Sequence, residues 1–246
     1  LIHPDCPTVT RQRITALIET RQATVPASFH LAEHFRPAID KPQYQTHIAR
    51  IQDYILAGDC YQVNYAQRFE ATLEGDAWSA YRYVRTLLAG GFSGFLRTAE
   101  DHAILSLSPE RFLRIHHGTV TSQPIKGTAP RHTDPEQDAA LAKALLNSEK
   151  DRAENVMITD LLRNDLGQFC ETGSVKVTEL CGLHSFNNVH HLISTVEGKL
   201  APGVSAGQML LATSPGGSIT GAPKKRAVEI IAELEATTRG AYCGSL

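Results

Sequence analysis

The order of strand-like and helix-like segments limits the folds open to this chain more than any other feature. Short strands are predicted first, then helices, then two more strands and two more helices. The strands are expected over 61–73, 94–97, 103–107, within a hairpin over 111–125, and over 174–180 and 189–196; the helices are expected over 77–89, from 135, and over 151–163, 206–212 and 222–235. Strand and helix do not alternate regularly, so the pattern predicts an α/β chain of the α+β type rather than a parallel sheet built from repeated units.

The chain of 246 residues is long enough for one large domain or two small ones. Residues 1–40 are polar and rich in proline, and we interpret them as a linker or the tail of a preceding region, with a short helix over 10–21. Residues 41–246 are expected to form the functional domain. The first residue is not methionine and the sequence stops abruptly, so we expect a piece of a longer protein that is incomplete at its C-terminus.

Composition excludes several classes of protein. There are 24 basic and 26 acidic residues, a balance that argues against a nucleic-acid-binding protein. No run of about 18 apolar residues occurs, so no membrane segment is expected. The five cysteines are widely spaced without a C-x-x-C pair, which predicts neither a disulfide framework nor a zinc site and favours a reducing cytoplasm.

Glu110 and Lys126 lie at the two ends of the predicted hairpin, each eight residues from its central Gly118. In a regular antiparallel ladder they would stand opposite each other, with Cβ atoms about 5 Å apart. The amine could then act as a nucleophile, and the acid could protonate a leaving hydroxyl. An exposed ion pair worth less than about 1 kcal/mol is the commoner meaning of this spacing, and spacing alone favours it.

Asp151 and Glu154 share one face of the helix predicted over 151–163. Glu154 also shares a face with Ile158 and Leu161, which are expected to point inward. A carboxylate on an apolar stripe needs a partner, and Mg²⁺ would suit because it binds through one or two carboxylates and keeps several waters. For Asp151 alone, an acid placed at a helix N-terminus is the better explanation.

Two further patterns are compatible with a site. The segment SPGGSITGAPKKRAVEII places a glycine-rich turn before a helix, and its free N–H groups could bind a carboxylate or phosphate, although a plain turn and helix cap fit equally well. His190 and His191 are neighbours on a predicted strand, so they should point to opposite faces and only one can face a site. A lone histidine is more often structural.

Seven motifs, in this order along the chain, resemble those of the chorismate-binding enzymes, which include anthranilate, aminodeoxychorismate, isochorismate and salicylate synthases. They are GDCYQVNYAQRF, SPERFL, PIKGTAPR, EKDRAENVMITDLLRNDLG, VHHLIST, GGSITGAPKKRAVEIIAELE and RGAYCGS. The resemblance covers residues 41–246. It implies two packed, mainly antiparallel sheets, helices outside them, and an active-site cleft between the two halves.

Lys126, in the PIKGT motif, matches the lysine that aminodeoxychorismate synthases have at this position. Anthranilate synthases have an alanine-like residue there, so the chain resembles the former. The resemblance implies that Lys126 attacks C2 of chorismate while Glu110 helps the C4 hydroxyl to leave. Ammonia, supplied from glutamine by an amidotransferase subunit, would then add at C4 and expel the lysine. The product would be 4-amino-4-deoxychorismate, a precursor of 4-aminobenzoate and folate.

Other roles are also implied by the resemblance. Glu154 matches a Mg²⁺ ligand, Asp151 a nearby acid that acts through water, and His191 the active-site histidine of the family. The residues that match positions contacting substrate carboxylates are Gly217, Ser218, Thr220 and Tyr242.

Two alternatives stay open. The chain could belong to an anthranilate or isochorismate synthase, or it could be a binding module that keeps the fold without catalysis. Members of the family continue beyond RGAYCGS with a strand that carries an arginine and with an acidic segment that supplies further Mg²⁺ ligands. The piece by itself is therefore expected to be inactive.

Overall fold

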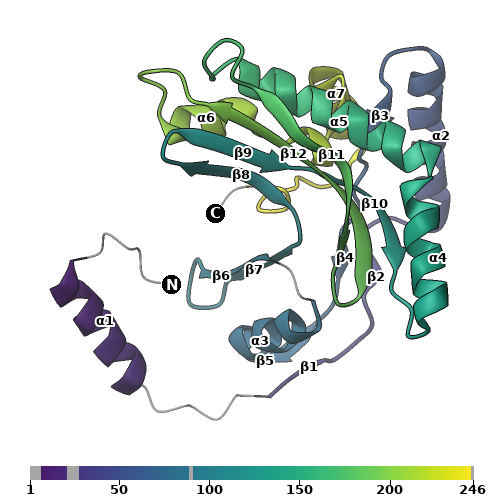
Figure 1. Cartoon of the computed structure of the whole chain (residues 1–246). Helices are drawn as coiled ribbons and strands as arrows, with labels where there is room; N and C mark the ends of the chain where they lie inside the picture. The colour runs from purple at the N-terminus through teal and green to yellow at the C-terminus, as the bar shows by residue number, and fades with distance from the viewer. Residues whose placement is uncertain (1–6, 21–27, 89–90, 245–246) are drawn as a thin grey trace.

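The centre of the molecule is a five-stranded antiparallel sheet (Figure 1). The computed structural model describes residues 7–20, 28–88 and 91–244. The strands of this sheet are β8 (Arg111–His116), β9 (Thr119–Gln123), β10 (Ile125–Pro130), β11 (Lys176–Ser185) and β12 (Val189–Lys199). One edge of β12 pairs with β11, and the other pairs first with β10 and then with β9. β9 and β10 thus form one broken strand, interrupted at Pro124.

Helix α5 (Glu149–Gly167) covers one face of this sheet. Its Ile158, Leu162 and Leu166 pack against Val120 of β9 and Val196 of β12 in the largest buried apolar cluster. Helix α4 (Pro135–Leu146) covers the neighbouring part of the same face, and α6 (Ala206–Thr213) adds Met209 to the cluster. Each fully buried aliphatic side chain contributes about 1.5–3 kcal/mol of transfer free energy, so this layer fixes the sheet to α5.

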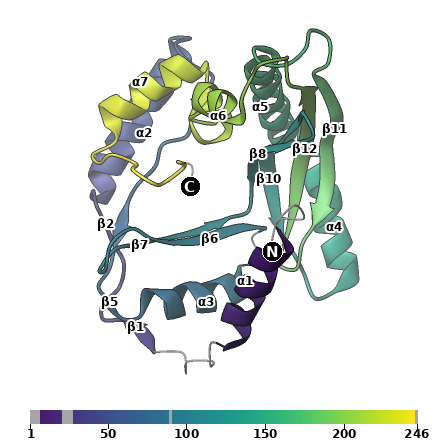
Figure 2. The ribbon, with the colours of Figure 1, turned by 90° about the vertical axis from the view of Figure 1, so that its left-hand side faces the viewer.

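A second layer brings together two helices that are far apart in the sequence. Helices α2 (Lys41–Leu56) and α7 (Lys224–Leu234) lie side by side (Figure 2), with Ile51, Cys60 and Ile230 buried between them. Strand β3 (Gln62–Val63) pairs with β13 (Gly221–Ala222), which follows the short 3-10 turn η1 (Gly217–Ile219). The segment after α2 is therefore held beside the glycine-rich turn, more than 150 residues later in the chain.

The other elements are small. Strands β6 (Phe92–Arg97) and β7 (Ala103–Ser108) form a hairpin, and helix α3 (Ala77–Leu87) packs beside it. Strand β1 (Phe29–Leu31) pairs with β5 (Leu73–Gly75), and β2 (Arg36–Pro37) pairs with β4 (Phe69–Glu70). The remaining helix is α1 (Thr8–Thr20). Among the described residues, no helix is long and apolar enough to cross a membrane.

The predicted α/β class with antiparallel sheets is confirmed, and within the described residues it takes the form of the five-stranded sheet and four two-stranded ones. The continuous strand predicted over 61–73 is wrong. That segment forms β3, β4 and the start of β5, and because each pairs with a different partner the backbone bends between them. The division at residue 40 stays a prediction, although β1 and β2 already pair with strands beyond it.

The helix limits also differ from prediction. α5 is longer than 151–163 because the Ser148 side chain accepts from the Asp151 N–H and caps the helix two residues earlier. α3 ends at Leu87, and the predicted end at residue 89 lies outside the described residues. The same holds for the predicted end of the first helix at residue 21.

Candidate active site

Glu110 and Lys126 do not stand opposite each other in a ladder, so the predicted register is wrong. A bulge between Arg111 and Arg114 shifts β8 against β9, and the last pair of that ladder joins Arg111 to Gln123. Beyond Pro124, Lys126 belongs to β10, which pairs with β12 instead. The two side chains nevertheless lie close enough to interact: the positive charge of Lys126 acts to lower the pKa of the Glu110 carboxyl.

Glu110 lies in a setting that favours its protonated form. Burial raises the pKa of its carboxyl, and this effect is opposed first by the Ser218 hydroxyl, then by Lys126 and by the Ile125 N–H. The Ser218 Oγ atom is buried close by, but it falls short of hydrogen-bond geometry with any partner in the described part of the chain. A carboxyl that keeps its proton to higher pH is suited to donate that proton to a leaving group.

Lys126 lies where the sheet meets the start of α5. Its Nζ donates to the Ser218 carbonyl oxygen at 2.8 Å. The next residue, Gly127, has φ +91°, and a Cβ on it would lie 2.9 Å from the Asp151 Cβ. Only glycine combines this backbone conformation with so close an approach, so the Lys-Gly pair places an amine beside the N-terminal turn of α5.

The glycine-rich turn contacts both Lys126 and α5. A Cβ on Gly217 would overlap Leu161 of α5, and the Thr220 hydroxyl donates to the Gly216 carbonyl at 2.9 Å. The predicted direct entry of this turn into a helix is wrong. Strand β13 and Pro223 separate the turn from α7, which begins at Lys224. The positive N-terminal end of the α7 dipole therefore does not lie in the turn. The turn can still bind an anion through its own N–H groups.

The predicted opposite orientation of His190 and His191 is confirmed. His190 is buried, and its two ring nitrogens lie 2.7 Å from the Ser185 hydroxyl and 3.1 Å from Asp138. His191 lies on the other face of β12, where burial lowers the pKa of its imidazole. It forms part of the lining of a pocket of about 210 Å³ together with Leu107, Pro109, Phe186 and Val189. The Thr128 hydroxyl, two residues after Lys126, lies 2.9 Å from Nδ1 of His191.

Tyr242 lies after α7 and is half exposed. The Arg239 guanidinium lies 5.7 Å from the centre of its ring. Cys243 comes near Glu110, whose charge acts on the pKa of the thiol. The C-terminal segment therefore comes near Glu110. Figure 2 shows that the chain after α7 turns back below that helix. Sequence reasoning singled out Tyr242 in RGAYCGS but not Arg239, although an arginine in a motif of otherwise small and aromatic residues was a signal.

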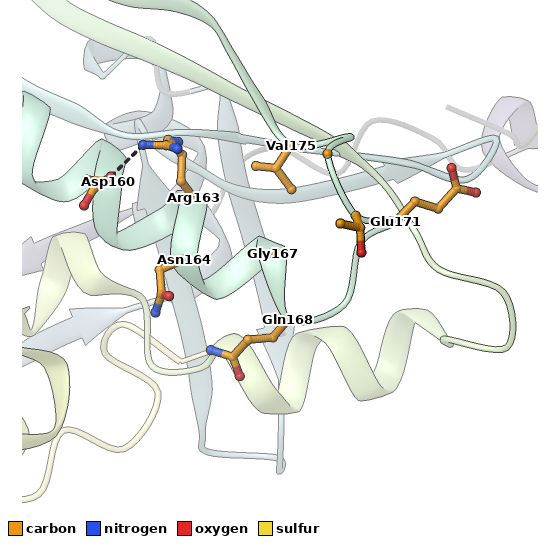
Figure 3. A pocket seen from close by; sticks show the side chains of 9 residues that line it. Asp160, Arg163, Asn164, Gly167, Gln168, Glu171 and Val175 are labelled. Carbon is orange, nitrogen blue, oxygen red and sulfur yellow. Dashed lines mark hydrogen bonds and ion pairs between the residues drawn. The ribbon is translucent and has the colours of Figure 1, made fainter.

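A larger cavity than the one beside His191 lies elsewhere among the described residues (Figure 3). It has a volume of about 620 Å³ and surrounds the C-terminal end of α5, where Arg163 and Asp160 form an ion pair at 2.7 Å. Its lining is mainly polar and contains none of the predicted site residues. Lys126, Glu110 and the glycine-rich turn are therefore the better candidate for the active site.

A family model described as chorismate binding enzyme matches residues 5–246. The chain belongs to this family. It is 51% identical over 231 residues to aminodeoxychorismate synthase component 1 from Klebsiella aerogenes, covering 94% of this chain and 51% of that protein. The corresponding protein of Escherichia coli K12 is 48% identical with the same coverage. The chain spans about half the length of the curated relatives it matches.

A solved structure of a chorismate-binding relative supports the fold as well. Anthranilate synthase component I from Streptococcus pneumoniae superimposes with a TM-score of 0.81 at 32% identity, covering 100% of this chain and 54% of that one. The family membership and fold class predicted from the motifs are confirmed. The roles of individual site residues stay predictions.

Asp151 and Glu154, the two residues predicted to bind Mg²⁺, both lie near the N-terminal end of α5. Glu154 is one-third exposed, and its nearest cation, the exposed Lys150, is 3.8 Å away, so the carboxylate is free to take another partner. Asp151 accepts from the Ser148 hydroxyl at 2.5 Å. No group of three or more candidate ligands occurs within residues 7–20, 28–88 and 91–244. Two carboxylates on one helix face fit Mg²⁺ held with several waters.

Proposed function

We propose that the protein containing this chain is an aminodeoxychorismate synthase component, which converts chorismate and ammonia to 4-amino-4-deoxychorismate. One observation carries the proposal: a lysine amine at position 126 lies at the glycine-rich turn, within the electrostatic reach of a carboxyl whose pKa is raised. The similarity to relatives named aminodeoxychorismate synthase component 1 supports the same activity. An amine nucleophile and a proton donor are the two groups that this substitution needs.

The chemistry follows from these two groups. The neutral Lys126 amine forms a bond to C2 of chorismate, the ring double bonds shift, and the C4 hydroxyl leaves as water with the proton of Glu110. Ammonia then forms a bond to C4, the double bonds shift back, and the lysine nitrogen leaves C2. The nitrogen added at C4 loses one proton, which returns to Glu110. The net change is replacement of the C4 hydroxyl by an amino group, with one ammonia consumed and one water released, and both Lys126 and Glu110 are regenerated.

The surrounding residues would hold the substrate. We assign the N–H groups of Gly217 and Ser218 to a carboxylate of chorismate, and Tyr242 to the ring carboxylate. Thr220 would shape the turn, because its hydroxyl is already bonded to Gly216. His191 would border the same space from β12. Glu154 and Asp151 would hold Mg²⁺, which when bound neutralises and orients a substrate carboxylate.

A partner protein completes the proposal. We propose that an amidotransferase subunit hydrolyses glutamine and delivers ammonia, in the reducing cytoplasm that fits four free thiols at Cys60, Cys170, Cys181 and Cys243. The purified full-length protein should then use ammonium ions alone, and glutamine only when the partner is added. Turnover of glutamine without a partner would show that the protein hydrolyses glutamine itself.

The test of the proposal is the product formed by the full-length protein from chorismate, ammonium and Mg²⁺. Chromatography against standards distinguishes 4-amino-4-deoxychorismate from anthranilate and isochorismate, and anthranilate is also recognised by its fluorescence. Either of the latter as the main product would place the protein in another branch of the family. Tight chorismate binding without any product would favour a binding module.

A further inference from the structure

Arg239 connects three parts of the chain that are far apart in sequence. Its Nη1 donates to the Ile219 carbonyl at 2.7 Å, and its Nη2 donates to the Asn64 carbonyl at 2.6 Å. The guanidinium also forms a bidentate pair with Glu235, with distances of 2.6 and 2.9 Å. Both side chains of this pair are largely buried. Such a fork fixes direction as well as distance, because the guanidinium is planar and its donors cannot rotate independently.

The target of the fork is the glycine-rich turn. Ile219 follows Ser218, so the Arg239 guanidinium and the Lys126 ammonium bind carbonyl groups of consecutive peptides. Asn64 adds two bonds to the same turn, from its side chain to the Ile219 carbonyl at 3.1 Å and from its N–H to the Thr220 carbonyl at 2.8 Å. The position of the Ser218 carbonyl, and with it the resting place of Lys126, therefore depends on the segment around Asn64 through Arg239.

We propose that Arg239 is a positioning residue that sets the Gly217–Thr220 turn against Asn64, so that Ser218 holds the Lys126 amine and the turn presents its N–H groups to substrate. Glu235 fixes the guanidinium from behind, since its carboxylate also accepts the Ala66 N–H at 2.9 Å. Arg239 also lies over the ring of Tyr242. The Lys126 amine, the N–H groups of the turn and the Tyr242 ring are all proposed to contact the substrate. Arg239 thus helps to position all three, although it is not itself at the reacting atoms. This role rests on the proposed function only for its effect on turnover.

The direct test is independent of turnover. The full-length protein, without substrate, is treated briefly with an amine-acylating reagent, and the labelling of each lysine is followed by peptide mass spectrometry. In Arg239→Lys the turn loses its fork, so we expect Lys126 to be acylated at least about fivefold faster than in the wild type, whereas the exposed Lys143 should not change. Arg226→Lys is the matched control, because Arg226 is a less buried arginine on α7 that pairs with Asp59 and Glu229. Equal labelling of Lys126 in the wild type and in Arg239→Lys overturns the proposal.

Kinetics adds a second readout. In Arg239→Lys, kcat/KM for chorismate should fall about thirtyfold or more, with an apparent Tm within a few degrees of that of Arg226→Lys. If Arg239→Lys does not fold, Glu235→Gln serves instead, since it keeps an acceptor for Ala66 and removes only the charged pair. It should raise Lys126 labelling and lower kcat/KM in the same direction, and no change in either would overturn the role. If the wild type makes no aminodeoxychorismate, the proposed function fails, but the labelling result still decides the role of Arg239.

Discussion

The layer between α5 and the sheet and the glycine-rich turn are held together by different forces. Ile158, Leu162 and Val196 are buried in an apolar cluster, where many weak contacts fix the sheet. The turn instead receives cationic donors: Lys126 binds the Ser218 carbonyl and Arg239 binds the Ile219 carbonyl. A third cation, Lys224, closes the segment by donating to the Thr213 carbonyl at 3.0 Å and to Asp165.

The difference separates stability from chemistry. Loss of one buried methyl group lowers the free energy of unfolding by a modest amount, and the remaining apolar contacts still hold the layer together. A polar turn has few contacts, and each one sets a direction, so a lost donor moves the groups that we propose to contact the substrate. Substitutions in the two regions should therefore affect different measurements.

The largest effect is expected from Lys126→Ala in the full-length protein. Formation of aminodeoxychorismate should fall about a thousandfold or more, because the covalent route through C2 is lost. C2 would then be open to ammonia or water, so the remaining product should shift toward the anthranilate or isochorismate type. Product ratios by chromatography check this, with Lys143→Ala as the control.

A second measurement examines the covalent step directly. Intact and peptide mass analysis of the wild type with chorismate and no ammonia should find an adduct on the peptide that contains Lys126. Normal production of aminodeoxychorismate by Lys126→Ala would reduce the lysine to an electrostatic role and reopen the alternatives within the family.

A somewhat smaller effect is expected from Glu110→Gln, on the order of a hundredfold in kcat. Burial raises the folded-state pKa of Glu110 above its ordinary value, so the carboxyl keeps its proton to higher pH than a free glutamate. Activity should therefore fall as pH rises through that raised pKa, and the stability contributed by the proton should be lost over the same rise. The pH–rate profile of Glu110→Gln should lack this descending limb; a profile unchanged from the wild type would assign the limb to another group.

Glu154 and Glu149 give a paired test on one helix. Glu154→Gln should raise the Mg²⁺ concentration for half-maximal activity at least about tenfold, because Mg²⁺ is held by only one or two protein carboxylates. Glu149 is exposed in the first turn of α5, and Glu149→Gln should change this concentration by less than about twofold. Equal effects of the two variants would indicate general electrostatics rather than a ligand.

The two regions also differ in how far sequence predicts them. The pattern of the sequence indicated α5, β12 and the opposite orientation of His190 and His191, because periodicity reports which residues share a face. The register of Glu110 against Lys126 was wrong because neither the bulge in β8 nor the break at Pro124 changes local periodicity. The contact of Lys126 with Ser218 spans 92 residues, and that of Arg239 with Asn64 spans 175. Such pairs follow from topology, so the motifs predicted the site residues without showing which contacts hold them in place.

The smallest effect, and the one that completes the comparison, is expected from Ile158→Val. Ile158 is fully buried in the apolar layer, and removal of one methylene should lower the free energy of unfolding by about 0.5–1.5 kcal/mol. The apparent Tm should fall by a few degrees, while kcat/KM at 25 °C should stay within about twofold, because the cations that hold the turn are untouched. Val156→Ala, at an exposed position of the same helix, should change neither quantity beyond error. A loss of activity in Ile158→Val as large as that in Arg239→Lys would show that the core and the turn are coupled, since α5 also contacts the turn through Leu161 and Gly217.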